Sequence, residues 1–137
     1  MNRLKEVLLV DDSKGTNSLH SRLLKEMDVV DTISVALNGQ QALDYLETKN
    51  GEGVCPAPVV IFLDNNMPVM DGYQFLEKYE NLGDEFKPAK SIVMVSSSDD
   101  DSDKMKTAKF PSVKHCLSKP LRREDVKAII DEVNDLG

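Results

Sequence analysis

The chain has 137 residues, the length of one ordinary domain, and 40% of them are hydrophobic, which is enough to form a core of normal size. Its 17 basic and 24 acidic residues give a formal net charge of −7. This acidic balance argues against binding to the phosphate backbone of nucleic acids, which requires a basic face, and it favours a basic or apolar protein partner.

The first apolar run predicts a buried strand followed by a helix. Residues Val7–Val10 are continuously apolar, as in a strand covered on both faces. Ser13 is a candidate N-cap, and Leu19, Leu23 and Met27 then recur every four residues. This spacing predicts a helix whose apolar stripe consists of those three side chains.

The middle of the chain repeats this order. Thr32–Ala36 predicts a second strand, which ends at the turn pair Asn38-Gly39, and a helix follows to about Lys49. Residues 50–58 have the composition of a loop. Val59–Leu63 is wholly apolar and is the strongest strand signal in the chain.

The last part of the chain continues the alternation. Strands are predicted at Ile92–Val95 and, more weakly, at Val113–Leu117. The segment Asp99–Lys109 has almost no apolar stripe, so the helix expected there is the least defined element. Two further amphipathic helices are predicted from the apolar residues Phe75, Leu76, Tyr79, Leu82, Val126, Ile129, Ile130 and Val133.

Strand and helix therefore alternate five times. Apolar strands joined by helical crossovers predict an α/β fold with a doubly wound, five-stranded parallel sheet covered on both faces. No linker or repeat divides the chain, so we expect one domain over residues 1–137. No apolar stretch is long enough for a signal peptide or a membrane span, and Cys55 and Cys116 lack metal-site spacing. We therefore expect a cytoplasmic protein with reduced cysteines.

Ionisable and hydroxyl side chains follow the strands at their carboxyl ends, where parallel sheets place their working sites. They are Asp11-Asp12, Asp64, Ser96-Ser97 and Lys119, after the first, third, fourth and fifth strands. Taken singly, each has an ordinary structural explanation as a helix cap, a turn or a loop residue. Taken together, three acids at one sheet edge repel each other unless a cation intervenes, and their oxygen ligands suit Mg2+.

This set of strand-end residues resembles that of the receiver domains of two-component response regulators. The resemblance is carried by Asp11-Asp12, Ser96, Lys119-Pro120 and the run Leu-Asp-Asn-Asn-Met-Pro-Val-Met-Asp-Gly at residues 63–72. It implies a flavodoxin-like (βα)5 sandwich. Because the chain ends directly after its last predicted helix, we expect a stand-alone receiver without an output domain.

The resemblance also implies a role for each matched residue. Asp64 matches the phosphoacceptor, and a phosphohistidine on a histidine kinase or phosphotransfer protein is the implied donor. The implied ligands of the cofactor, Mg2+, are Asp11, Asp12, Asp64 and the backbone carbonyl of Asn66. The residues implied to stabilise the phosphoryl group and to move with it are Ser96, Ser97 and Lys119. The family also suggests a cis bond between Lys119 and Pro120.

The chain departs from the family at Cys116, where many receivers carry a Tyr or Phe that changes rotamer on phosphorylation. Cys116 is small and cannot make that movement. We therefore expect the phosphorylation signal to involve Ser96 and the segment after it, with little contribution from residue 116.

Three other functions share part of this pattern. A Rossmann nucleotide-binding domain requires a glycine-rich first loop, where this chain has Asp11-Asp12. A phosphatase of the haloacid dehalogenase type requires a second Asp two positions after its nucleophile, where this chain has Asn66. The alternative that stays open is a receiver-like binding module that is not phosphorylated. In either case we expect signalling through an unknown downstream protein, without nucleic-acid binding, membrane binding or conventional enzyme activity.

Overall fold

The computed structural model describes residues 3–48, 51–53, 55–65, 67, 70–83, 86–87, 89–96 and 109–135. It contains a five-stranded parallel sheet with the strand order β2-β1-β3-β4-β5. The strands are β1 (Leu4–Val10), β2 (Val30–Ala36), β3 (Val60–Asp64), β4 (Ser91–Ser96) and β5 (Val113–Ser118). The described helices are α1 (Lys14–Met27), α2 (Gly39–Glu47), α3 (Gly72–Glu80) and α5 (Arg123–Asp135). The predicted doubly wound sheet is therefore confirmed. Apart from Lys109, the weak helix predicted at Asp99–Lys109 lies outside the described residues.

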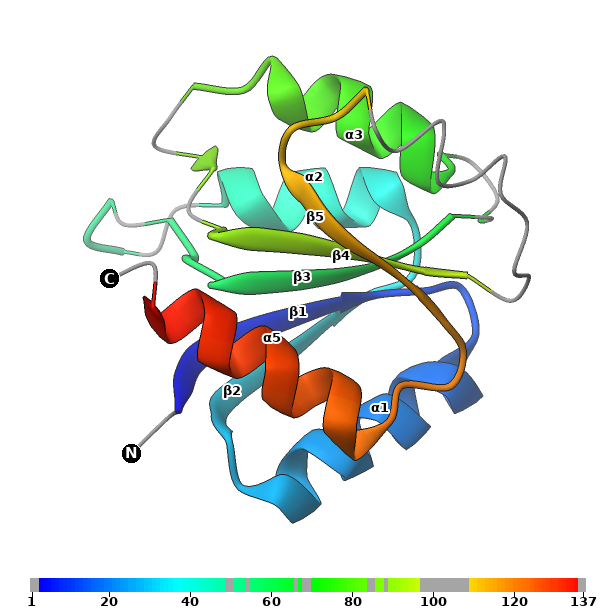
Figure 1. The fold of residues 1–137 in the computed structure, drawn as a ribbon. Helices are drawn as coiled ribbons and strands as arrows, with labels where there is room; N and C mark the ends of the chain where they lie inside the picture. The colour runs from blue at the N-terminus through cyan, green and yellow to red at the C-terminus, as the bar shows by residue number, and fades with distance from the viewer. Residues whose placement is uncertain are drawn as a thin grey trace.

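The helices cover both faces of the sheet. Figure 1 shows α1 and α5 on one face and α2 and α3 on the other. Because side chains alternate across a strand, neighbouring residues of the central strands pack under different helices. Leu8 and Ile61 belong to the core cluster beneath α2 and α3, whereas Leu9 and Phe62 belong to the cluster beneath α1 and α5. Burial on both faces explains why the central strands are continuously apolar. No helix in the described part of the chain is long and apolar enough to cross a membrane.

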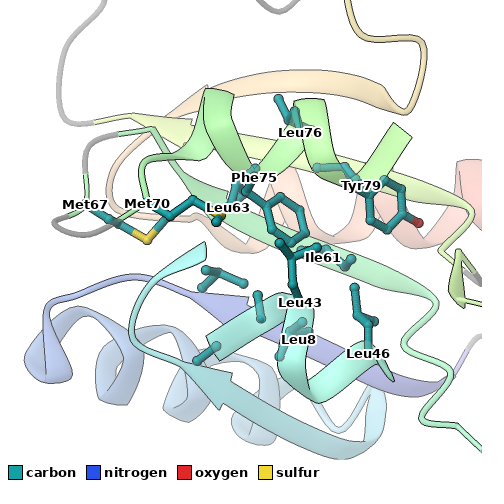
Figure 2. Close-up of a cluster of buried hydrophobic side chains, with 14 of the residues drawn as sticks. Leu8, Leu43, Leu46, Ile61, Leu63, Met67, Met70, Phe75, Leu76 and Tyr79 are labelled. Carbon is teal, nitrogen blue, oxygen red and sulfur yellow. The ribbon is translucent and has the colours of Figure 1, made fainter. Parts of the chain in front are cut away.

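The core beneath α2 and α3 fixes the position of β3. The rings of Phe75 and Tyr79 on α3 stack with their centroids 5.6 Å apart. Figure 2 shows these rings in one cluster with Leu43 of α2 and Ile61 of β3. All five residues of β3 are buried, and each large apolar side chain among them contributes roughly 1.5–3 kcal/mol. The strand that ends at Asp64 is therefore buried along its whole length, as β4 is.

In helix α1 the predicted N-cap is confirmed, but the predicted apolar stripe is not the buried face. The hydroxyl of Ser13 accepts a backbone N–H of the first turn at 3.1 Å. Leu19, however, is 52% exposed, and Leu23 and Met27 pack only at the edge of the core. The buried residues of α1 are Asn17, His20 and Leu24. The predicted stripe was wrong because sequence patterns locate the buried face of a helix from its apolar residues. In α1, two of the three buried residues, Asn17 and His20, are polar.

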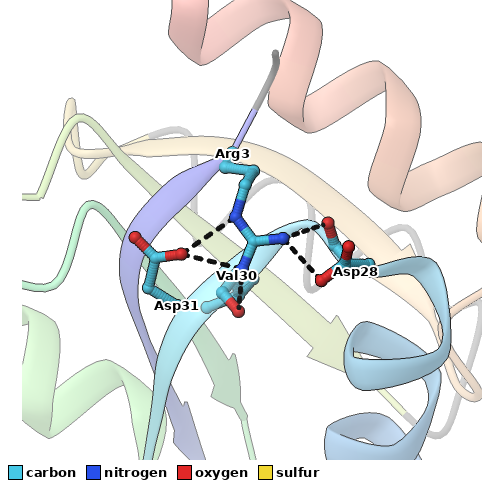
Figure 3. A network of polar contacts seen from close by, with 4 residues as sticks. All are labelled: Arg3, Asp28, Val30 and Asp31. Atoms are coloured by element: carbon cyan, nitrogen blue, oxygen red, sulfur yellow. Dashed lines mark hydrogen bonds and ion pairs between the residues drawn. The ribbon is translucent and has the colours of Figure 1, made fainter.

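A polar network ties the start of β1 to the turn between α1 and β2 (Figure 3). Asp28 caps α1 in the left-handed conformation, with φ at 55°. The guanidinium of Arg3 donates to the backbone carbonyl of Asp28 at 2.7 Å and to the carboxylate of Asp31 at 2.9 Å. Exposed ion pairs contribute little to stability, so this network mainly sets the local path of the chain.

Candidate functional site

Four ionisable side chains meet at the carboxyl edge of the sheet. In Figure 1 this edge lies at the right-hand ends of the strands. Asp11 and Asp12 follow β1, Asp64 ends β3, and Lys119 follows β5. One carboxylate oxygen of each of the three acids lies within 4.8 Å of the others. The structure thus brings together the residues that their positions after the strands predicted.

Asp11 is held in place by both its backbone and its side chain. It is only 4% exposed. Its Oδ1 accepts the backbone N–H of Ser13 at 2.9 Å, and its Oδ2 lies 2.6 Å from the ammonium of Lys119. Its backbone carbonyl accepts the side-chain amide of Asn17 at 2.8 Å. These contacts fix the orientation of the carboxylate, whereas neighbouring Asp12 is exposed at the surface of the cluster.

Asp64 is the second buried carboxylate of the cluster and is 5% exposed. Its Oδ1 is 3.4 Å from the ammonium of Lys119. The backbone behind it is in close contact with Gly72, the first residue of α3, where an added Cβ would lie 2.6 Å from the carbonyl oxygen of Asp64. The run at residues 63–72 therefore needs a glycine at this position because α3 begins against the end of β3.

Lys119 supplies the positive charge of the site. Its backbone N–H donates to the carbonyl of Ser96 at 2.8 Å, which joins it to the end of β4. Burial alone would lower the pKa of Lys119, but the hydrogen bond to Asp11 and the charges of Asp64 and Asp11 outweigh it and raise the pKa above its ordinary value. The lysine is therefore a permanent cation at neutral pH. The expected cis bond to Pro120 is confirmed.

The charge of the cluster fits a divalent metal ion. Three carboxylates and one ammonium carry a net charge of −2 when all are ionised. The metal-facing atoms are all oxygens, and one of the three acids is open to solvent. Hard oxygen donors in a partly hydrated pocket are what Mg2+ prefers. The described residues therefore match the requirements of Mg2+.

The remaining predicted site residues differ in what the structure describes. Ser96 is the last residue of β4, at the same edge of the sheet, and is 6% exposed. Cys116 is half-buried and packs against the core beneath α2 and α3. Asn66 and Ser97 lie outside the described residues. The proposed metal-binding carbonyl of Asn66 and the proposed role of Ser97 stay predictions.

Two residues near the site were not predicted from the sequence, namely Asn17 and His20 on the inner face of α1. Asn17 donates to the backbone of Asp11, and Nε2 of His20 accepts the backbone N–H of Leu121 at 3.3 Å. Burial lowers the pKa of His20; the charge of Asp11 opposes this effect and the charge of Lys119 adds to it. The only signal in the sequence is that Asn17, His20 and Leu24 have helical spacing.

Comparison with known proteins agrees with this geometry. Residues 7–131 match the response regulator receiver domain, so the chain belongs to that family. It is 29% identical to the two-component response regulator ARR22 of Arabidopsis thaliana, with 97% of this chain and 86% of the relative covered. It is 28% identical to the probable methanogenesis regulatory protein FilR2 of Methanothrix harundinacea, over 94% of this chain and 81% of the relative.

Solved structures give the same fold. A two-component response regulator from Cytophaga hutchinsonii superimposes with a TM-score of 0.87 at 25% identity, covering 97% of this chain and 98% of that one. Some relatives are longer proteins: the protein-glutamate methylesterase/protein-glutamine glutaminase of Desulfotalea psychrophila is 35% identical, but the match covers only 24% of its length. The name of that relative therefore describes a whole protein of which this chain resembles only a part.

Proposed function

We propose that this receiver domain is a Mg2+-dependent phosphoacceptor that takes a phosphoryl group onto Asp64. One observation carries the proposal: the buried carboxylate of Asp64 ends the central strand β3 with two further carboxylates and an ammonium around it. A carboxylate so placed can attack phosphorus only if the negative charge of the incoming group is offset. The ammonium of Lys119 provides part of that offset.

The transfer would proceed by direct displacement. An oxygen of Asp64 attacks the phosphorus of a phosphohistidine, the P–N bond breaks, and the imidazole nitrogen keeps the electron pair and takes up a proton. Bound Mg2+, held by Asp11, Asp12, Asp64 and the carbonyl of Asn66, would supply positive charge to the phosphoryl oxygens. The hydroxyl of Ser96, with Ser97 beside it, would donate to one of those oxygens. Water then hydrolyses the acyl phosphate and regenerates the carboxylate.

The implied partners follow from this chemistry. The phosphoryl donor would be a histidine kinase or a phosphotransfer protein, and the chain is similar over most of its length to part of the hybrid signal transduction histidine kinase L of Dictyostelium discoideum. The phosphorylated domain would then signal by contact with a downstream protein or by phosphorelay. In this proposal the domain assists its own phosphorylation and dephosphorylation and has no conventional enzyme activity.

A receiver-like module that is never phosphorylated is the weaker alternative. Such a module has no need to keep two buried carboxylates beside a half-buried lysine, because clustered ionised groups are costly to desolvate. The described site retains all of them.

The proposal is tested with a small phosphoryl donor and without a kinase. The purified protein is incubated with phosphoramidate, either with Mg2+ or with a chelator, and its intact mass is measured over time. We expect one phosphoryl group per chain, gained only when Mg2+ is present. A protein that stays unmodified under both conditions, or that gains the group equally well with chelator, would contradict the proposal.

A further inference from the structure

His20 is a buried polar residue to which the chemistry described above gives no role. It lies on the inner face of α1 and is 4% exposed. With Asp11 and Asp64 it lines a cavity of about 10 Å3, and Asn17 lines the same cavity. His20 therefore lies directly beneath the acidic cluster, on the side of the sheet covered by α1.

The hydrogen bonds of the segment after β5 connect His20 to Lys119. The segment Lys119-Pro120-Leu121 contains two backbone N–H groups, because proline has none. The N–H of Lys119 donates to the carbonyl of Ser96 at 2.8 Å. The N–H of Leu121 donates to Nε2 of His20 at 3.3 Å. Each N–H of the segment is thus bonded to a different element, one to β4 and the other to α1. The side chain of Lys119 leaves the backbone between these two N–H groups.

The contact requires a specific form of the histidine. Since Nε2 accepts a hydrogen bond, it carries no proton, and the imidazole is neutral with its proton on Nδ1. An unpaired N–H at Leu121 would be costly, because Leu121 is only 5% exposed and water cannot readily replace the acceptor. A leucine or valine on α1 would fill the same space but could not hold this N–H.

We propose that His20 is a positioning residue for Lys119. By accepting the N–H of Leu121, it fixes the backbone after β5 so that the ammonium of Lys119 reaches Asp11 at 2.6 Å and Asp64 at 3.4 Å. This inference rests on the proposed phosphorylation of Asp64, for which Lys119 would supply positive charge. A purely structural alternative is that the burial of Leu121 in the core holds the segment without the histidine.

Three variants separate these two explanations. His20→Leu removes the acceptor but keeps an apolar side chain, and His20→Gln retains an oxygen that can accept in place of Nε2. Leu24→Val is the matched control, since it thins the same helix–sheet core from a neighbouring turn of α1 without removing a polar group. Phosphorylation by phosphoramidate at saturating Mg2+ is measured for each variant, alone and combined with Lys119→Ala.

We expect His20→Leu to slow phosphorylation by roughly tenfold, the order expected when one buried hydrogen bond is lost. His20→Gln should recover most of that rate, and Leu24→Val should phosphorylate as fast as the wild type. In the Lys119→Ala background, His20→Leu should cause no further loss of phosphorylation rate, because the effects of two substitutions that remove the same interaction do not add. Wild-type phosphorylation of His20→Leu, or an equal loss with and without Lys119, would overturn the inference.

A second readout does not depend on phosphorylation. Trace labelling of lysines with an acylating reagent, followed by peptide mapping, reports how well the ammonium of Lys119 is held. We expect His20→Leu to raise the labelling of Lys119 several-fold and Leu24→Val to leave it unchanged. A wild-type protein that accepts no phosphoryl group would overturn the proposed function; unchanged labelling in His20→Leu would overturn the positioning role of His20.

Discussion

The ammonium of Lys119 lies closer to Asp11 than to Asp64, at 2.6 Å and 3.4 Å respectively. Both carboxylates are buried, so the lysine offsets the repulsion between them. If Asp64 receives a phosphoryl group, new negative oxygens appear beside the lysine. Under the proposed function, the ammonium of Lys119 would therefore change its partner from a carboxylate oxygen to a phosphoryl oxygen. This requires only a short movement of a charge that is already in the site.

Lys119→Ala should impair both phosphorylation and stability. The rate of phosphorylation should fall by roughly 10²-fold, the size of effect seen when one transition-state charge donor is removed. The free energy of unfolding in metal-free buffer should fall by about 1–3 kcal/mol, because two buried carboxylates lose their cation. Mg2+ should restore most of this stability. Urea unfolding with and without Mg2+ checks the second effect, and a variant as stable as the wild type without metal would count against the ion-pair cluster.

Asp12→Ala should weaken Mg2+ binding severely while leaving the fold intact. Asp12 is the exposed member of the acidic cluster, so its removal opens no cavity. It also relieves repulsion among three carboxylates, so stability in metal-free buffer should be unchanged or higher. Titration calorimetry measures the affinity. An Mg2+ affinity equal to that of the wild type would mean that the metal binds elsewhere.

Gly72→Ala should destabilise the protein by about 1–3 kcal/mol, because the new Cβ would lie 2.6 Å from the backbone oxygen of Asp64, which cannot rotate away. The displaced strand end should also slow phosphorylation. Gly15→Ala is the control, since the nearest atom to its added Cβ is 3.8 Å away and alanine is favoured in a helix by about 0.5–1 kcal/mol. Equal stability of the two variants in thermal unfolding would contradict the close packing at Gly72.

The stability of the protein should fall in mildly acidic buffer partly because of His20. Burial lowers the pKa of His20 in the folded state, so the unfolded chain takes up a proton first as the pH falls below about 6.5. The unfolding free energy should then decrease by up to about 1.4 kcal/mol per pH unit until the lowered folded-state pKa is reached. His20→Gln should show a shallower pH dependence in urea unfolding between pH 7.5 and 5. A slope identical to that of the wild type would assign the effect to other groups.

The sequence allowed the fold to be predicted because the central strands are buried on both faces. Val7–Val10 and Val59–Leu63 are apolar throughout, and each marks a strand of the parallel sheet. The face of α1 that packs against the sheet could not be predicted in the same way. Its inner face contains Asn17 and His20, which are buried because the backbones of Asp11 and Leu121 satisfy them. Leu121 is far from His20 in the sequence, and Asp11, although close to Asn17, meets its side chain only in the folded chain.

The sequence predicted which residues form the candidate site, but it did not predict the contacts between them. The rule that functional residues follow parallel strands brings Asp11, Asp64 and Lys119 together, as the structure confirms. It does not indicate that Lys119 lies nearer to Asp11, because that distance is set by the folded backbone and not by the order of the strands. The roles of Asn66 and Ser97, like the effect of Cys116 on signalling, stay predictions.

The identity of the modified residue is the most direct test of the account. The wild type and Asp64→Asn are treated with phosphoramidate and Mg2+, the acyl phosphate is reduced with borohydride, and the altered peptide is located by mass spectrometry. We predict that the wild type is modified at Asp64 alone and that Asp64→Asn takes up no phosphoryl group. Modification of Asp64→Asn to the wild-type extent, mapped to a residue elsewhere in the chain, would contradict the assignment of Asp64 as the phosphoacceptor.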